Sequence, residues 1–169
     1  MNDIASRPEL DPELNLQSPI LLELLRHWQR AKADKPLPAR ADIDPLNLGP
    51  SLLPFILLAD VEYHPVRRFR WRLVGTHVTQ TLGRDVTGAY WDETYSNDVL
   101  ASLHLRADWL MEHLRPLRAV GLSPRPGRHA GSSETLYLPL SDDGATVNMI
   151  MLGSVYIIAP KREGQDGGG

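Results

Sequence analysis

Histidine is the residue type in this sequence with the clearest capacity to bind a cofactor. His104 lies one helical turn beyond Leu100 and two turns before Met111, in a stretch of helical apolar periodicity. A helix histidine that faces a cavity can ligate haem iron through a ring nitrogen, which makes His104 a haem-ligand candidate. The alternative is a partly buried histidine with an ordinary hydrogen bond. His77 and His113 are open to the same two interpretations.

Two short runs combine hydroxyls with carboxylates: Ser132-Ser133-Glu134 and Ser141-Asp142-Asp143. Each lies in a turn-like stretch, where Asp and Ser side chains commonly bond to nearby backbone groups. There is no nucleophile elbow, phosphate-binding glycine loop or metalloprotease motif, and no pair of histidine and acidic residues has a metal-binding spacing. The sequence therefore predicts that the protein is not an enzyme, and it predicts no metal site apart from the haem candidate.

Arginines at two places in the sequence are candidates for binding an anion or a partner. Arg40 lies close to Asp42 and Asp44, which indicates a local salt link with helix caps, or else an anion or partner site. Further arginines surround one predicted strand and loop, where they either contact a phosphate or acidic partner or are scattered on the surface: Arg115, Arg118, Arg125 and Arg128.

Charge and cysteine content exclude several classes of function. The 169 residues carry a formal net charge of -3, so we expect no nucleic-acid partner and no association with an anionic membrane. The chain has no cysteine, which excludes disulfides, thiolate catalysis, cysteine zinc sites and a cysteinyl-flavin photoadduct. The longest apolar run, residues 149–159, is about half the length that a membrane helix needs. The N-terminus lacks the pattern of a secretory signal, and we predict a cytoplasmic protein.

The chain divides into a flexible N-terminal arm (1–17), an amphipathic helix (18–35), a domain (36–160) and a disordered C-terminal tail (161–169). Ser18 and Pro19 form a typical helix start, and Leu21, Leu25 and Trp28 follow at helical spacing. So apolar a helix must be covered. It packs either on the core or on the same helix of a second molecule.

The domain is predicted to run in the order two strands, helices and three strands. A hairpin is predicted from strands 55–63 and 69–74, with Phe69, Trp71 and Leu73 on one face. On the other face, Arg72 is solvated or holds a carboxylate across the sheet. A short helix (77–82) and a long helix (97–114) follow, and then three strands (117–122, 135–140 and 146–158), with Leu136, Leu138 and Leu140 in phase on the middle one.

Several stretches in this order carry a family resemblance: LLELLRHW (21–28), LPARADIDPLNL (37–48), RFRWRLVGT (68–76), LGRDVTG (82–88) and LYLPLSDDGATVNMIMLG (136–153). They resemble a PAS domain and, more narrowly, the stand-alone PAS-like family of alphaproteobacteria. The resemblance implies an α+β fold, with a PAS-like five-stranded antiparallel sheet and helices across one face. An additional N-terminal helix can cover the other face.

The resemblance implies a sensory or signalling module that binds a small molecule, haem among the possibilities, between the sheet and the long helix. The candidates for the pocket lining are Trp71, Leu73, Thr76, His104, Met111 and Leu138. The expected partners are a second copy, bound through the N-terminal helix, and a separate signalling protein that supplies the output. The alternative is a ligand-free interaction or dimerisation module, with the cavity filled by side chains such as Trp71, Tyr90, Trp91 and Met111.

Overall fold

The structure, a computed structural model, describes residues 9–122 and 131–157. The α+β class and the antiparallel sheet are confirmed, but the sheet has six strands in place of the expected five, in the order β1-β4-β5-β6-β2-β3. The strands are β1 (Glu9–Asp11), β2 (Ile56–Glu62), β3 (Arg68–Val74), β4 (Leu117–Leu122), β5 (Ser132–Leu140) and β6 (Met149–Ile157).

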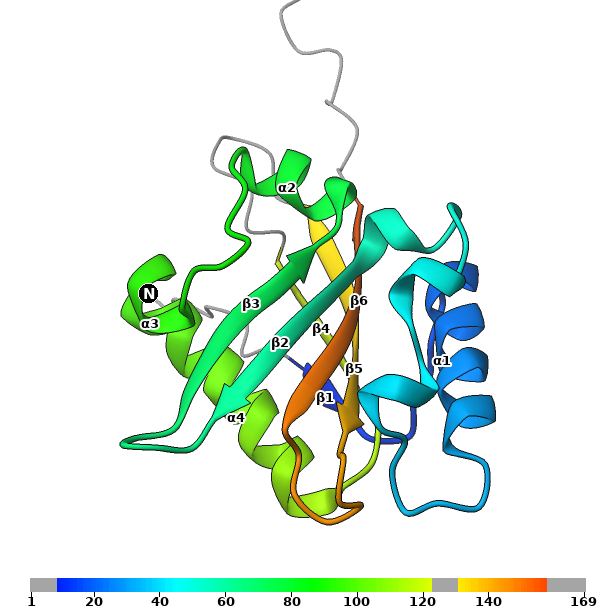
Figure 1. The fold of residues 1–169 in the computed structure, drawn as a ribbon. Coiled ribbons are helices and arrows are strands. Elements are labelled where there is room, and N and C mark those ends of the chain that lie inside the picture. Colours follow the sequence, from blue (N-terminus) through cyan, green and yellow to red (C-terminus); the bar gives the residue numbers. More distant parts are fainter. Residues whose placement is uncertain (1–8, 123–130, 158–169) are drawn as a thin grey trace, which may run out of the picture.

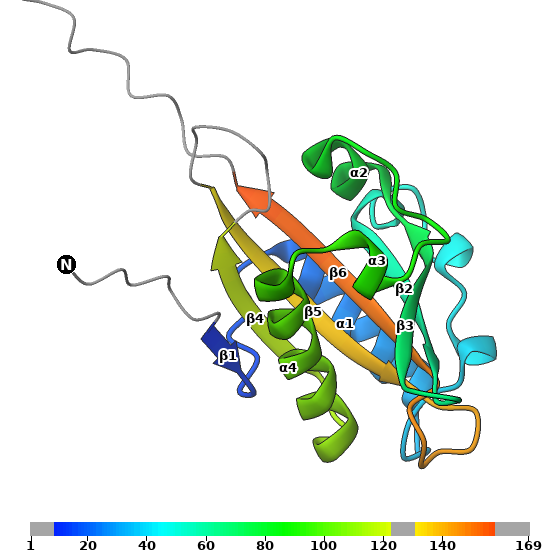
Figure 2. The same ribbon diagram turned by 90° about the vertical axis from the view of Figure 1, so that its left-hand side faces the viewer.

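Helices cover both faces of this sheet (Figures 1 and 2). One face carries α1, together with the segment of short 3-10 turns that follows it, and the other face carries α2, α3 and α4. The helices are α1 (Pro19–Lys32), α2 (Thr76–Leu82), α3 (Trp91–Thr94) and α4 (Asn97–His113), and the 3-10 turns are η1 (Arg40–Asp42), η2 (Pro45–Asn47) and η3 (Leu53–Phe55). Within residues 9–122 and 131–157, no helix is both long enough and apolar enough to cross a membrane.

The additional strand belongs to the segment that was expected to be a flexible arm. Residues 9–11 form β1, which pairs antiparallel with the edge of β4, Leu10 opposite Ala119. A mostly buried ion triad fixes this pairing: Arg118 donates to Asp11 over 3.0 Å and to Glu134 over 2.7 Å. Arg118 is therefore a structural residue, whereas the sequence placed it among surface arginines. Arg125, Arg128 and the predicted tail 161–169 lie outside the described residues.

The same triad holds the start of α1. Glu134 accepts hydrogen bonds from the backbone amides of Gln17 and Ser18, over 2.8 and 2.9 Å. Burial raises the pKa of Asp11, but bonds from Asn15 and then Arg118 outweigh it, and the net effect is a lowered pKa. The run Ser132-Ser133-Glu134 opens β5, so the expectation that it lies in a turn is wrong, and its acidic member anchors the N-terminal segment.

Helix α1 begins at Pro19 as predicted and packs on the core of its own chain. Leu21, Leu24 and Trp28 are buried, and the Trp28 indole donates to the carbonyl of Pro139 on β5 over 3.0 Å. A Cβ atom at Gly153 would lie 2.6 Å from a Leu24 methyl, so the helix sits directly on the bare backbone of β6. The apolar stripe predicted on this helix is thus covered within the molecule.

A β-bulge changes the predicted faces of β3. Leu73 pairs with Leu58 and Trp71 pairs with the next residue of β2, Ala59, which leaves Arg72 as an extra residue. Trp71 and Leu73 therefore point to opposite faces of the sheet, and the expectation that they share a face is wrong. Arg72 bonds Asp60 across the strands over 2.9 Å, as one of its two interpretations predicted.

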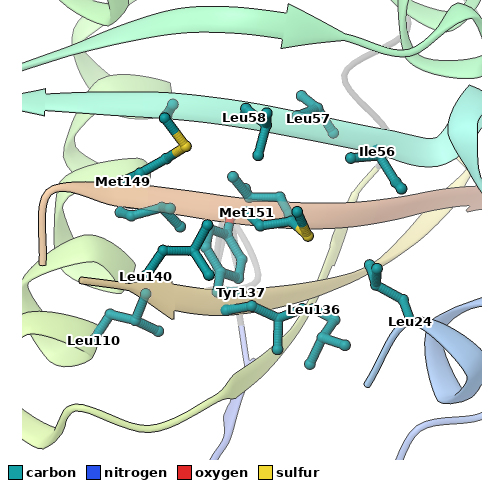
Figure 3. Packing of buried hydrophobic residues seen from close by; sticks show 14 of the residues in the cluster. Leu24, Ile56, Leu57, Leu58, Leu110, Leu136, Tyr137, Leu140, Met149 and Met151 are labelled. Carbon is teal, nitrogen blue, oxygen red and sulfur yellow. The ribbon is translucent and has the colours of Figure 1, made fainter. Parts of the chain in front are cut away.

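The core lies on both sides of β5 and β6 (Figure 3). Leu136 and Met151 face the side of Leu24, because they share a face with Gly153. Tyr137 faces the opposite side, where it meets α4. At the middle of the two strands the side toward α1 is apolar, with Glu134 at its end, whereas the side toward α4 includes polar groups.

Candidate functional site

Four polar side chains from different elements converge on the sheet face that α2, α3 and α4 cover. Arg106 comes from α4, Tyr137 from β5, Tyr156 from β6, and Tyr95 from the residue that ends α3. Each of the three phenols interacts electrostatically with at least one other member of the group. We call these four residues the tyrosine–arginine cluster.

The guanidinium of Arg106 is the centre of this cluster. Its Nη1 donates to the Tyr137 hydroxyl over 3.2 Å, and its carbon lies 5.8 Å from the centre of the Tyr137 ring. Its Nε is buried and has no hydrogen-bond partner in the part of the chain that the structure describes. A buried donor without a partner costs about 1–3 kcal/mol, so the cluster is incomplete as it stands.

The phenols of the cluster remain protonated at neutral pH. Burial raises the pKa of Tyr137, and the nearby Arg106 only partly opposes this effect. Burial likewise raises the pKa of Tyr95 and of Tyr156. Tyr137 is fully buried, whereas Tyr95, Tyr156 and Arg106 are half-buried and can be reached from solvent.

An aromatic group continues the cluster toward β3. The Trp71 indole donates to the Tyr95 hydroxyl over 2.9 Å, and its ring lies 5.1 Å from that of Trp91. Trp91 in turn stacks on Phe69 at 4.3 Å. The Trp91 indole Nε1 is buried without a partner among the described residues, which makes it a second unsatisfied donor on this side of the sheet.

His77 closes the side of the cluster next to α2. Its ring stacks on Tyr156 at 5.5 Å, and its Nε2 accepts from the backbone amide of Tyr156 over 3.2 Å. Burial lowers the pKa of His77. The imidazole is therefore a neutral acceptor, with its proton on Nδ1.

A comparison with protein-family models agrees with this architecture. A scan against protein-family models matches the PAS domain over residues 16–156, which is most of the chain. This chain belongs to the PAS domain family. A search of the curated proteins gives no match.

A solved structure titled as that of an RNA-binding light-oxygen-voltage receptor is similar to this PAS domain, with 15% sequence identity and a TM-score of 0.43. The match covers 70% of this chain and 35% of the receptor, so the chain spans about a third of the receptor's length.

Of the predicted pocket residues, Trp71 lies nearest the cluster of this PAS domain, through its bond to Tyr95. His104 packs edge-on against Phe69 at 5.4 Å and against Trp91 at 6.3 Å, so its ring contributes to aromatic packing. Met111 lies at the other end of α4, where its sulfur accepts from Arg67 over 3.6 Å.

Haem ligation by His104 would require the imidazole to give up its aromatic contacts. In the described part of the chain, no group of three or more metal-ligating side chains gathers at one point. The aromatic packing of His104 thus gives no support for a haem ligand at this position.

The other predicted pocket residues lie on other surfaces. Leu138 faces α1, because it pairs with Met151 on the side of Gly153. Leu73 and Thr76 line a groove of about 350 Å³ at the end of β3, together with residues of η2 and η3. We call it the Leu46 groove; its lining is Leu46, Pro50, Leu53, Pro54, Leu73, Val74, Gly75 and Thr76.

A second hollow, of about 370 Å³, separates α1 from η1 and η2. It is lined by His27 and Arg30 on one side and by Asp42, Asp44 and Asn47 on the other. Arg40 beside it reaches Asp44 at 3.6 Å and donates to the carbonyl of Ile43, so the predicted local salt link is confirmed.

The second run of hydroxyl and acidic residues is a turn, as predicted. Asp143 accepts from the backbone amides of Thr146 and Ala145, over 2.7 and 2.8 Å, and from the Ser141 hydroxyl over 2.8 Å. These bonds hold the pKa of Asp143 well below its ordinary value. The carboxylate is committed to backbone donors and shapes the turn.

The sequence-based interpretation missed Tyr95, Arg106, Tyr137 and Tyr156. A signal for the two strand tyrosines was present. Thr135 and Tyr137 alternate with leucines on β5, and Ser154 and Tyr156 occupy the matching face of β6. Polar residues in phase on two strands that are covered on both faces indicate a polar interior surface.

Proposed function

We propose that this PAS domain is a sensory module that binds a small molecule at the tyrosine–arginine cluster. The observation that carries the proposal is a pair of buried donors, Arg106 Nε and Trp91 Nε1, that have no partner among the described residues and lie on one face of the sheet. Buried polar groups in native proteins are normally hydrogen-bonded. A ligand with acceptor atoms would satisfy donors on this face.

Signalling would follow from a shift between two packings of α4 on the sheet. A ligand in contact with Arg106 and Tyr137 binds α4 and β5 at once, so it favours the packing in which both contacts are made. Because α1 lies on the opposite face of β5 and β6, a change on the cluster side alters its support. The output then depends on contacts with a separate signalling protein.

The proposal is tested on freshly purified protein. Native and denaturing mass spectrometry of one sample, together with an absorbance spectrum, reveals any small molecule that the protein retains. We expect a released ligand, or a metabolite that raises the melting temperature. We also expect that effect to be lost in Tyr137→Phe and kept in the turn variant Tyr63→Phe. A clean apo mass with no thermal shift across a metabolite library would reject ligand sensing.

A second candidate function is a partner-binding module, and the Leu46 groove favours it. Leu46 is 72% exposed, a high value for a leucine, and it borders a groove with a mostly apolar lining. The exposed side of α1 carries Glu23, Arg26 and Arg30, so a homodimer through this helix would rest on polar contacts. Light scattering of Leu46→Asp beside the parent protein tests self-association at the groove. A mass that is equal and monomeric for both proteins would count against it.

The proposal includes no catalytic step, because the hydroxyl and carboxylate runs serve turn and anchor roles. We also propose that the protein is located in the cytoplasm. Fractionation of cells that produce the tagged protein tests the location.

A further inference from the structure

We propose that the ligand of the tyrosine–arginine cluster is a small organic carboxylate, whose anionic group is held by Arg106 and by the hydroxyls of Tyr95 and Tyr137. This inference rests on the proposed function and names the chemical class of the ligand. It follows from two independent features of the cluster, its uncompensated charge and its excess of donors.

Within the described residues, no carboxylate lies within 4 Å of the Arg106 guanidinium. Four arginines are half-buried in the described part of the chain, and three of them have a carboxylate within 4 Å. Arg40 has Asp44, Arg68 has Asp92 and Glu93, and Arg118 has Asp11 and Glu134.

Arg106 is the exception, since its hydrogen bond within the described residues goes to the neutral phenol of Tyr137. The arginines without a carboxylate elsewhere in the described ranges, such as Arg84 and Arg115, are exposed to water. Removing a cation from water without a partner is unfavourable, and an anionic ligand would supply the missing charge.

Donors outnumber acceptors at the same place. The oxygen of Tyr137 already accepts from Arg106, and the oxygen of Tyr95 already accepts from Trp71. Each hydroxyl proton is therefore free to point to a further acceptor, and no described residue supplies one. Together with Nε of Arg106, the cluster offers at least three donors that no described residue uses.

A carboxylate matches this set, because its two oxygens accept several hydrogen bonds and bind a guanidinium with good geometry. The raised pKa values of Tyr95 and Tyr137 support the match, since they keep both phenols in the donating form. A ligand cation would meet the like charge of Arg106 and an excess of donors. A neutral amide would place its own N–H donors against them.

The test uses pairs of probes that differ in charge and share a shape: benzoate with benzamide, and hexanoate with hexanamide. Binding is measured by calorimetry and thermal shift at constant ionic strength. We expect the carboxylate of at least one pair to bind about tenfold more tightly than its amide. Arg106→Gln should abolish this preference. The matched control Arg115→Gln, on an exposed arginine just after α4, should keep it.

If Arg106→Gln does not fold, Arg106→Lys and Tyr137→Phe replace it, and each should weaken carboxylate binding and leave amide binding unchanged. Equal binding of carboxylate and amide by the parent protein would overturn the inference while leaving ligand sensing intact. Preference retained in the folded Arg106 variants would overturn the role of this residue. If neither probe pair binds, the charge of the molecule that mass spectrometry finds in the purified protein tests the inference. An organic anion supports the inference, a neutral or cationic molecule overturns it, and no molecule at all rejects it together with the proposed function.

Discussion

The backbone amide of Tyr156 donates a hydrogen bond to Nε2 of His77 over 3.2 Å, which joins α2 to the end of β6. The imidazole also lies between two aromatic rings, at 4.6 Å from Phe55 and 5.5 Å from Tyr156. The bond requires a neutral ring, because a protonated imidazole has no acceptor nitrogen. Folding and protonation of His77 are therefore coupled.

This coupling predicts a pH dependence of stability. Burial lowers the pKa of His77 below its ordinary 6.5. As the pH falls through 6.5, the unfolded chain takes up a proton that the folded protein resists, so the free energy of unfolding decreases. His77→Phe keeps the ring contacts but loses an acceptor, at a cost of about 1 kcal/mol. We expect this variant to be less stable at pH 7.5, and its stability to change less between pH 7.5 and 5 than that of the parent.

Urea denaturation at several pH values measures both quantities. His64→Asn, which replaces an exposed turn histidine, is the control and should retain the slope of the parent protein. An equal slope in His77→Phe and the parent would show that His77 does not contribute to the pH dependence.

The ion triad predicts a large difference between buried and exposed pairs. Glu134→Gln removes a carboxylate from Arg118 and weakens the anchor of Ser18, and we expect a loss of about 3 kcal/mol in the free energy of unfolding. Arg72→Gln breaks an ion pair whose arginine is 59% exposed, and it should cost less than about 1 kcal/mol. Chemical denaturation compares the two. Similar losses would contradict the assignment of the triad as the anchor of β1 and α1.

Alanine substitutions at two glycines are predicted to lower the free energy of unfolding by different amounts. A Cβ atom at Gly75 would lie 2.2 Å from the backbone oxygen of Pro54, which cannot move aside without displacing η3. At Gly153 the close atoms are side-chain methyls of Leu21 and Leu24, which can shift. We expect Gly75→Ala to cost about 3 kcal/mol and Gly153→Ala about 1–2 kcal/mol.

Gly83→Ala is the control for these glycine variants, because its position has open space but a φ of +73°, and it should cost about 1 kcal/mol. Melting curves of the three variants give the order. A Gly75→Ala protein as stable as Gly83→Ala would mean that η3 is less firmly held than its contacts indicate.

The burial of α1 predicts that its apolar residues stabilise the fold and do not mediate self-association. Leu21→Ala should cost about 3 kcal/mol, since this side chain is fully buried on the sheet, and it should leave the molar mass in solution unchanged. Leu25→Ala, at a half-buried position of the same helix, should cost distinctly less. Denaturation with parallel light scattering separates the effects. A change of mass without a change of stability would instead place Leu21 at an interface between molecules.

Local signals predicted much of the fold. Ser18 and Pro19 mark the start of α1, and the Asp44 side chain accepts from the amide of Leu46 as a cap of η2. Gly83 adopts the left-handed conformation that ends α2. These features depend on neighbours in sequence, and the sequence shows them directly.

The missed features depend on pairing between distant segments. β1 is short and apolar at one position, and its stability comes from Arg118, a residue more than a hundred positions away. The bulge at Arg72 shifts the phase of β3 by one residue, which separates Leu73 from Trp71. The same kind of phase error placed Leu138 in the pocket and left Tyr137 out, since neighbouring strand residues point to opposite faces.

At Gly153, the backbone of β6 alone separates the two helical layers. The missing side chain of this glycine lets Leu21 and Leu24 rest on the backbone, while the next residue, Ser154, turns its hydroxyl to the opposite layer and meets Thr135 over 3.0 Å. The surface that α1 contacts and the surface beside the cluster are therefore formed by two consecutive residues, Gly153 and Ser154. A displacement of β6 would therefore move the surface under α1 and the surface beside the cluster together, which couples the two helical layers.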